Sequence, residues 1–94
     1  MIFVLAKMII KKGKNEEFLD KTKNLIKKTR LEDGSISYNL YVSTEEENVF
    51  IMIEQWKNGN YLNEHLQTNH FTKFVDETSD ILAEDIDIEQ YSVN

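Results

Sequence analysis

The hydrophobic residues of this chain recur with two different spacings, which predict strands in some stretches and helices in others. Apolar side chains that alternate, or that form a short continuous run, indicate a strand, whereas a return every three or four residues indicates a helix. By these criteria the strands are residues 2–10, 35–43, 49–56 and 85–93. The helices are residues 15–30, a short helix that Asn58 caps and that carries residues 61–66, and a third that carries residues 71–82.

The order of these elements predicts the fold class. Strand, helix, strand, strand, helix pair and strand is the split βαβ order of the ferredoxin-like fold, an α+β architecture. In this fold the helices cover one face of a four-stranded antiparallel sheet. We therefore expect residues 1–94 to form a single ferredoxin-like domain.

Two of the predicted strands are apolar on both faces. In the first strand, Val4, Met8 and Ile10 share one face, and the other face carries Phe3, Leu5 and Ile9. The strand at residues 49–56 shows the same pattern. Since the helices cover only one face, the second apolar face would remain open, and such surfaces mark association sites. We expect a homodimer packed sheet to sheet; the alternative is a monomer with a partly apolar open face.

The other two strands are less uniform. The apolar residues of the last strand change parity between Ile88 and Tyr91, which indicates a bulge or a change of surroundings. Asp33-Gly34 marks a turn before the second strand, and the acidic run at residues 44–48 predicts a hairpin loop after it. Alternation gives the second strand one apolar face, formed by Ile36, Tyr38, Leu40 and Val42.

Composition and charge narrow the class of protein. Eleven Lys and Arg against seventeen Asp and Glu give a net charge of −6. This argues against nucleic acid or an anionic membrane as partner, because both bind basic surfaces. The absence of cysteine excludes disulfides, thiolate metal sites and cysteine nucleophiles. Lys7 interrupts the apolar run at residues 1–10, which lacks the flanks of a signal peptide, so we expect a strand there and a cytoplasmic protein.

One segment of the chain carries a family resemblance. Residues 51–74 read IMIEQWKNGNYLNEHLQTNHFTKF, in which the matching features are Glu54-Gln55-Trp56, His65-Leu66-Gln67-Thr68 and His70-Phe71. This segment resembles the antibiotic biosynthesis monooxygenase (ABM) family, and most closely its quinol monooxygenase-like branch. The order of elements matches the family over essentially the whole chain. Asn69 stands where the family commonly has proline, a difference that affects helix geometry more than chemistry.

The resemblance implies both an architecture and an activity. The architecture is a dimeric α+β barrel of two ferredoxin-like sheets, with a pocket between each sheet and its own helices. The activity is a cofactor-independent monooxygenation, in which a quinol or a similar electron-rich aromatic reacts with O2 without flavin, haem or metal. The alternatives are a small-molecule binding or stress-response module without oxygenase activity, and an isomerase or degradative enzyme for a small signalling metabolite.

Two histidines are the candidate catalytic residues. His65 falls on the apolar side of its helix, where it is either a core residue or a base. An apolar pocket would favour the neutral form, which accepts a phenolic proton. His70 precedes the third helix and points to the pocket mouth or to solvent. The two lie five residues apart across a helix break, which is not a standard metal-binding pair, and we identify no third ligand. We therefore expect no metal.

The candidate substrate-binding residues are mostly aromatic. Trp56 is either a core or interface anchor or a pocket wall that stacks on a flat substrate. Tyr38 and Asn39 occupy opposite faces of the second strand, so only one can face the pocket, and parity favours Tyr38. Phe71 and Phe74 are core residues or pocket walls.

Two further expectations concern Glu54 and haem. Glu54 shares a face with Trp56 and needs a partner if it is buried, and we expect that partner across the dimer. The haem-degrading branch of the family has an Asn, a Trp and an iron-ligating His at positions that here hold Ala6, His65 and Val75. All three haem residues are missing, so we expect no haem.

Overall fold

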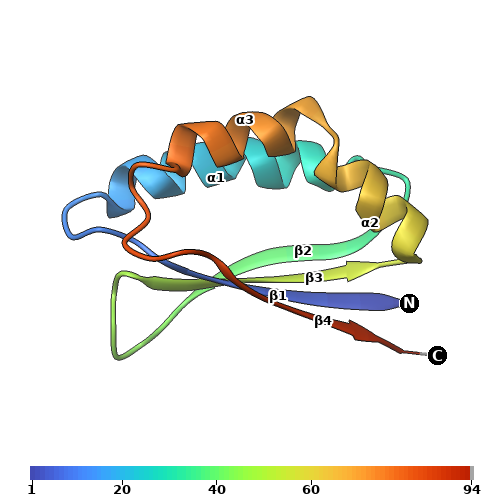
Figure 1. Cartoon of the computed structure of the whole chain (residues 1–94), viewed down its shortest axis with the longest axis horizontal. Helices are drawn as coiled ribbons and strands as arrows, with labels where there is room; N and C mark the ends of the chain where they lie inside the picture. The colour runs from blue at the N-terminus through green and yellow to red at the C-terminus, as the bar shows by residue number, and fades with distance from the viewer. Residues whose placement is uncertain (94) are drawn as a thin grey trace.

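The computed structural model describes residues 1–93, which form a four-stranded sheet with the helices packed on one of its faces (Figure 1). In chain order the elements are β1 (Ile2–Ile9), α1 (Asn15–Thr29), β2 (Ser35–Val42), β3 (Val49–Trp56), α2 (Gly59–Leu66), α3 (Asn69–Thr78) and β4 (Asp87–Ser92). The strand order is β2-β3-β1-β4, and each neighbouring pair is antiparallel. The predicted ferredoxin-like α+β fold is therefore confirmed.

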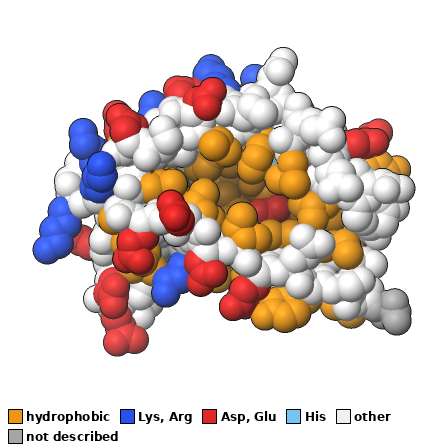
Figure 2. All heavy atoms as spheres, viewed as in Figure 1, with side chains coloured by type: hydrophobic (Ala, Val, Ile, Leu, Met, Phe, Trp, Pro, Cys, Tyr) orange, Lys and Arg blue, Asp and Glu red, His pale blue; other side chains and the backbone are white. Residues whose placement is uncertain are grey.

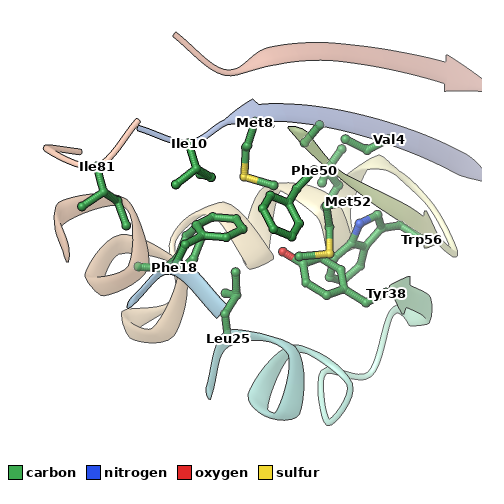
Figure 3. Packing of buried hydrophobic residues seen from close by; sticks show 13 residues of the cluster. Val4, Met8, Ile10, Phe18, Leu25, Tyr38, Phe50, Met52, Trp56 and Ile81 are labelled. Carbon is green, nitrogen blue, oxygen red and sulfur yellow. The ribbon is translucent and has the colours of Figure 1, made fainter. Parts of the chain in front are cut away.

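The core lies between the sheet and α1. β1 and β3 pair along their whole length, from Ile2 opposite Trp56 to Ile9 opposite Val49. Because successive side chains point to opposite faces, one set of alternating residues on each strand turns toward the helices. Figure 3 shows side chains of these strands packed toward Phe18 of α1. Trp56 is fully buried, as the alternation requires of the helix-facing side of β3, and Phe18 of α1 is fully buried against the sheet.

The opposite face of the sheet carries no helix (Figure 1). Its central residues are only half-buried: Phe3, Leu5 and Ile9 on β1, and Val49, Ile51 and Ile53 on β3. The prediction that both strands are apolar on both faces is confirmed. Within the described chain this second face remains accessible.

Polar side chains cap the N-termini of α2 and α3. The side chain of Asn58 accepts hydrogen bonds from the backbone N–H groups of Asn60 and Tyr61, at 3.0 and 3.2 Å, which confirms the predicted cap. Thr68 caps α3 by accepting from the N–H of Phe71 at 3.3 Å, and its hydroxyl donates to the carbonyl of His65 at 2.7 Å. Thr68 therefore caps α3 and bonds to the last turn of α2, which links the two helices.

No helix within residues 1–93 has the length and the apolar character needed to cross a membrane.

The third helix is shorter than its apolar spacing predicts. α3 ends at Thr78, whereas we expected it to include Ile81 and Leu82. The backbone after the helix instead bonds to the end of β1: Lys11 N–H donates to the carbonyl of Ile81, and Leu82 forms a bridge with Ile10. Ile81 is buried all the same. The spacing of apolar residues indicates which side chains are buried, and a buried turn can produce the same spacing as a helix.

The irregularity expected in the last strand lies in β2. β4 pairs with β1 in unbroken register, so the bulge predicted near Ile88 is wrong. Ile88 and Tyr91 lie on opposite faces of β4, and every residue of this strand is exposed. The apolar residues can therefore change from one face to the other without a break in the strand. The register shift occurs between Ser35 and Ser37. It leaves Ile36 46% exposed, outside the apolar face that alternation predicted.

Gly34 permits a close approach between the start of β2 and α2, and this contact generates a first prediction. A Cβ atom at Gly34 would overlap the side chain of Tyr61. We expect Gly34→Ala to lower the free energy of unfolding by about 1–3 kcal/mol, the usual cost of overpacking. Urea denaturation measures this change.

Gly59→Ala is the matched control, because nothing lies within 4 Å of a Cβ built there. Gly59 begins α2, where alanine favours the helix, so this variant should be unchanged or up to about 1 kcal/mol more stable. Equal losses in the two variants would contradict the proposed steric cause.

Candidate active site

A cavity of about 120 Å³ lies between the sheet and the helices, lined by residues of all four strands and of α1, α2 and α3. Figure 2 shows the hollow on one face of the molecule, with hydrophobic side chains around it and an acidic side chain at its floor. Most of the described lining residues are apolar. The polar groups among them belong to Tyr38, Glu54, His65 and Gln90. The cavity can therefore hold an apolar ligand while directing a few polar contacts at it.

His65 occupies the wall that α2 contributes to the cavity. Its side chain is 1% exposed. The ring packs among the aromatic side chains of Trp56, Phe71 and Tyr38, with centroid separations of 4.7, 5.0 and 5.4 Å. These contacts fix the orientation of the imidazole before any ligand binds.

Glu32 joins the two histidines. It lies between α1 and β2, and its Oε2 atom is 2.7 Å from His65 Nδ1 and 2.8 Å from His70 Nε2. A carboxylate oxygen only accepts hydrogen bonds, so we assign protons to both of these ring nitrogens. The prediction that His70 precedes the third helix and points to the pocket mouth or to solvent is wrong: His70 lies in the first turn of α3, its side chain is 13% exposed, and it bonds to Glu32 without lining the cavity.

The bond to Glu32 determines what the other nitrogen of His65 can do. With Nδ1 donating to the carboxylate, Nε2 of a neutral ring carries a free lone pair. Nε2 is buried and has no hydrogen-bond partner among residues 1–93. Desolvation lowers the pKa of His65, against the smaller opposite effects of the hydrogen bond and charge of Glu32. The ring is therefore neutral near pH 7, and Nε2 is a proton acceptor without a partner.

Glu54 is a second buried polar group at the cavity. It is 6% exposed, and its Oε1 accepts a 3.0 Å hydrogen bond from Nε1 of Trp56. Burial raises the pKa of Glu54 to about 7; the Trp56 bond opposes this shift and the charge of Glu32 adds to it. Glu54 was expected to find its partner across the dimer. The structure instead pairs it within the chain, because its side chain turns toward the helices and away from the open face.

The predicted substrate-binding residues occupy different places around the cavity. Tyr38, Phe71 and Phe74 line it. Trp56 lies behind the lining, against the ring of His65 and the carboxyl group of Glu54. Asn39 lies on the other face of β2, where its Oδ1 accepts a 2.9 Å hydrogen bond from Arg30.

The burial of Tyr38 follows the parity prediction and has an electrostatic consequence. Its side chain is 3% exposed. Burial, followed by the charges of Glu54 and Glu32, raises the pKa of the phenol. Tyr38 therefore stays protonated near pH 7 and can donate a hydrogen bond.

Glu32 is the residue that the sequence did not reveal. It stands 33 positions before His65, in a turn, and no local spacing connects it to either histidine. We identified no third ligand beside the two histidines, whereas the structure places this carboxylate against both. The three ligand atoms lie within 4.8 Å of one another, so these residues could also hold a metal ion. At 2.7 and 2.8 Å the contacts of Glu32 with the two histidines have hydrogen-bond lengths.

Comparison with known proteins agrees with this fold. A sequence model described as antibiotic biosynthesis monooxygenase (ABM) matches residues 1–77. The chain is 35% identical over 88 residues to YcnE of Bacillus subtilis (strain 168), a protein named as a candidate monooxygenase. That alignment covers 94% of this chain and 93% of YcnE. The chain therefore belongs to the ABM family.

Solved structures show the same relationship. A conserved protein from Methanosarcina mazei Go1 is 33% identical, with a TM-score of 0.93 and coverage of 96% of this chain and 89% of that one. A candidate antibiotic biosynthesis monooxygenase from Caulobacter crescentus CB15 is 26% identical, with a TM-score of 0.93. The match covers 99% of this chain and 90% of the Caulobacter crescentus chain. Together with the sequence relatives, these structures support a monooxygenase-like function.

The raised pKa of Glu54 makes stability depend on pH. Its pKa is about 7 when folded against 4.5 when unfolded, so the folded chain holds the extra proton. The stability that Glu54 contributes is complete below pH 4.5 and is lost as the pH rises to about 7. Glu54→Gln removes this loss and keeps an oxygen to accept from Trp56. We expect the variant to exceed the wild type at pH 8 by up to about 3 kcal/mol, a difference that disappears near pH 4.

Denaturant unfolding of both proteins across this pH range measures the effect. Glu45→Gln, which removes a carboxylate from an exposed loop, is the control, and its stability relative to the wild type should not change with pH in this way. A Glu54→Gln advantage that stayed constant with pH would contradict the titration of Glu54.

Proposed function

We propose that this protein is a cofactor-independent monooxygenase that oxidises a quinol or a similar electron-rich aromatic with O2. The observation that carries the proposal is Nε2 of His65, a buried ring nitrogen without a partner among residues 1–93, in the wall of an apolar cavity. Membership of the ABM family and the likeness to YcnE support the reaction class.

The first step is removal of a phenolic proton by His65. Nε2 accepts the proton, and the imidazolium that forms is stabilised by the carboxylate of Glu32, 2.7 Å from Nδ1. His70 donates to the same carboxylate oxygen and holds it in place. General-base catalysis of this kind contributes about 10²- to 10⁴-fold to a rate. The resulting anion gives up an electron to O2 more readily than the neutral quinol does.

The remaining chemistry balances without an external reductant. The quinolate transfers one electron to O2, and the two radicals combine at a ring carbon. Loss of water from the peroxide leaves a hydroxyquinone. One quinol and one O2 thus give one hydroxyquinone and one water, and the substrate supplies all the electrons. The apolar lining of the cavity limits the contact of these intermediates with water.

The open face of the sheet supports a homodimer. The half-buried apolar residues of β1 and β3 on this face form a contiguous surface, because the two strands are hydrogen-bonded neighbours. A second copy packed face to face would bury them and leave the cavity, on the helix side, accessible to substrate.

Oxygen consumption with quinols tests the proposed activity. Purified protein should take up O2 in the presence of hydroquinone or menadiol faster than buffer does, with product mass followed in parallel. His65→Ala should lower kcat/KM by about 10²- to 10⁴-fold, because the proton acceptor is lost. Glu32→Gln should lower it as well, whereas Glu45→Gln on an exposed loop should not.

Two results would go against this proposal. Uptake no faster than buffer across a broad quinol panel would favour a binding module or another reaction. Full activity in His65→Ala would remove His65 as the base while leaving the reaction class in place.

Light scattering tests the dimer. We expect a mass of twice 11.1 kDa at micromolar concentration. Ile53→Lys places a charge at the centre of the open face and should yield monomers, whereas Lys28→Glu, on the exposed side of α1, should not. A monomeric wild type would refute the proposed assembly.

A further inference from the structure

The base mechanism leaves one buried acid at the cavity unused. Glu54 reaches the lining from β3 and is 6% exposed. Its Oε1 is occupied by the N–H of Trp56, which leaves Oε2 for a ligand. His65, on α2, contributes to the same lining. The two groups come from opposite layers of the fold and line the same cavity.

We propose that Glu54 acts as a protonated carboxylic acid that donates a hydrogen bond to a second oxygen of the ligand, so that the cavity selects single-ring aromatics with two oxygen substituents. This inference rests on the proposed function, in which His65 takes the proton of the first oxygen. Glu54 is then a residue that determines specificity, and nothing in the base mechanism requires it.

The surroundings of Glu54 favour its protonated form. No lysine or arginine is found among the described lining residues, so no cation compensates a charge there. The titratable groups near it are Tyr38 on β2, His65 on α2 and Glu32 before β2. Two of these are neutral near pH 7, and Glu32 adds a negative charge that disfavours a second one. Burial acts in the same direction and raises the pKa of Glu54 to about 7.

The size of the cavity limits how many aromatic rings a ligand can have. An apolar cavity of about 150 Å³ in another protein binds benzene. A cavity of about 120 Å³ that opens to solvent accommodates a ligand of about one ring. With His65 as proton acceptor and Glu54 as proton donor, beside the polar groups of Tyr38 and Gln90, the cavity fits a benzenediol better than a phenol or a two-ring diol.

Calorimetric titration under anaerobic conditions tests this proposal without turnover. Hydroquinone, phenol and naphthalene-1,4-diol are the probes, at about pH 6, below the pKa of Glu54. The wild type should bind hydroquinone about 3- to 10-fold more tightly than phenol, the ratio expected for one added hydrogen bond. It should bind naphthalenediol more weakly than hydroquinone. Fluorescence of Trp56, the single tryptophan, should change with hydroquinone because its N–H bonds to Glu54.

Two variants of Glu54 identify the role of the acid. Glu54→Gln keeps an oxygen for Trp56 and an N–H for the ligand, so it should keep the preference for hydroquinone. Glu54→Leu removes both and should bind hydroquinone and phenol within about 2-fold of each other. If the leucine variant does not fold, the glutamine variant still decides the question.

The outcomes separate this inference from the proposed function. A wild type that binds both probes equally, a glutamine variant that loses the preference, or tighter binding of the two-ring diol would overturn it. Selective binding of hydroquinone without O2 consumption in the aerobic assay would overturn the oxygenase proposal and leave the role of Glu54 standing.

Discussion

The hydrogen bond between Glu32 and His65 is the interaction on which the site depends. It joins the connection before β2 to the end of α2, and it spans 33 residues of sequence. The side chain of His65 is 1% exposed, so Nδ1 has no access to water and depends on the carboxylate of Glu32 as its partner. Because the carboxylate takes Nδ1, the remaining nitrogen of the imidazole has its lone pair free and is buried beside the cavity. This contact thereby sets the tautomer of the proposed base and helps to position it, while burial keeps the ring neutral.

Aromatic side chains pack around polar groups at the cavity, and these buried polar groups lower the stability of the fold. A buried carboxyl group at Glu54 and an unpartnered nitrogen on His65 are features that a core optimised for stability would exclude. The surrounding rings of Trp56, Phe71 and Tyr38 hold these groups in place. Such local departures from stable packing are typical of sites where a ligand completes the missing contacts.

Much of the fold follows from the sequence because strand and helix periodicities are local. Alternation assigned Tyr38 to the buried face of β2 and both faces of β3 to apolar contacts, and the cap at Asn58 marked the start of α2. The spacing of apolar residues gave a wrong prediction where a residue is buried outside a helix or exposed within a strand. Ile81 is buried in a turn rather than in α3, and Ile36 is displaced by a register shift that no spacing rule reveals.

The sequence by itself determined the fold class, the family and the presence of a histidine on the buried side of α2. These depend on the order and periodicity of residues, which are properties of short segments. Only the tertiary structure decided that Glu32 bonds to both histidines and that Glu54 lines the cavity. The two bonds of Glu32 require atoms 33 and 38 residues apart in the chain to meet within about 3 Å, a distance that depends on how the helices close over the sheet.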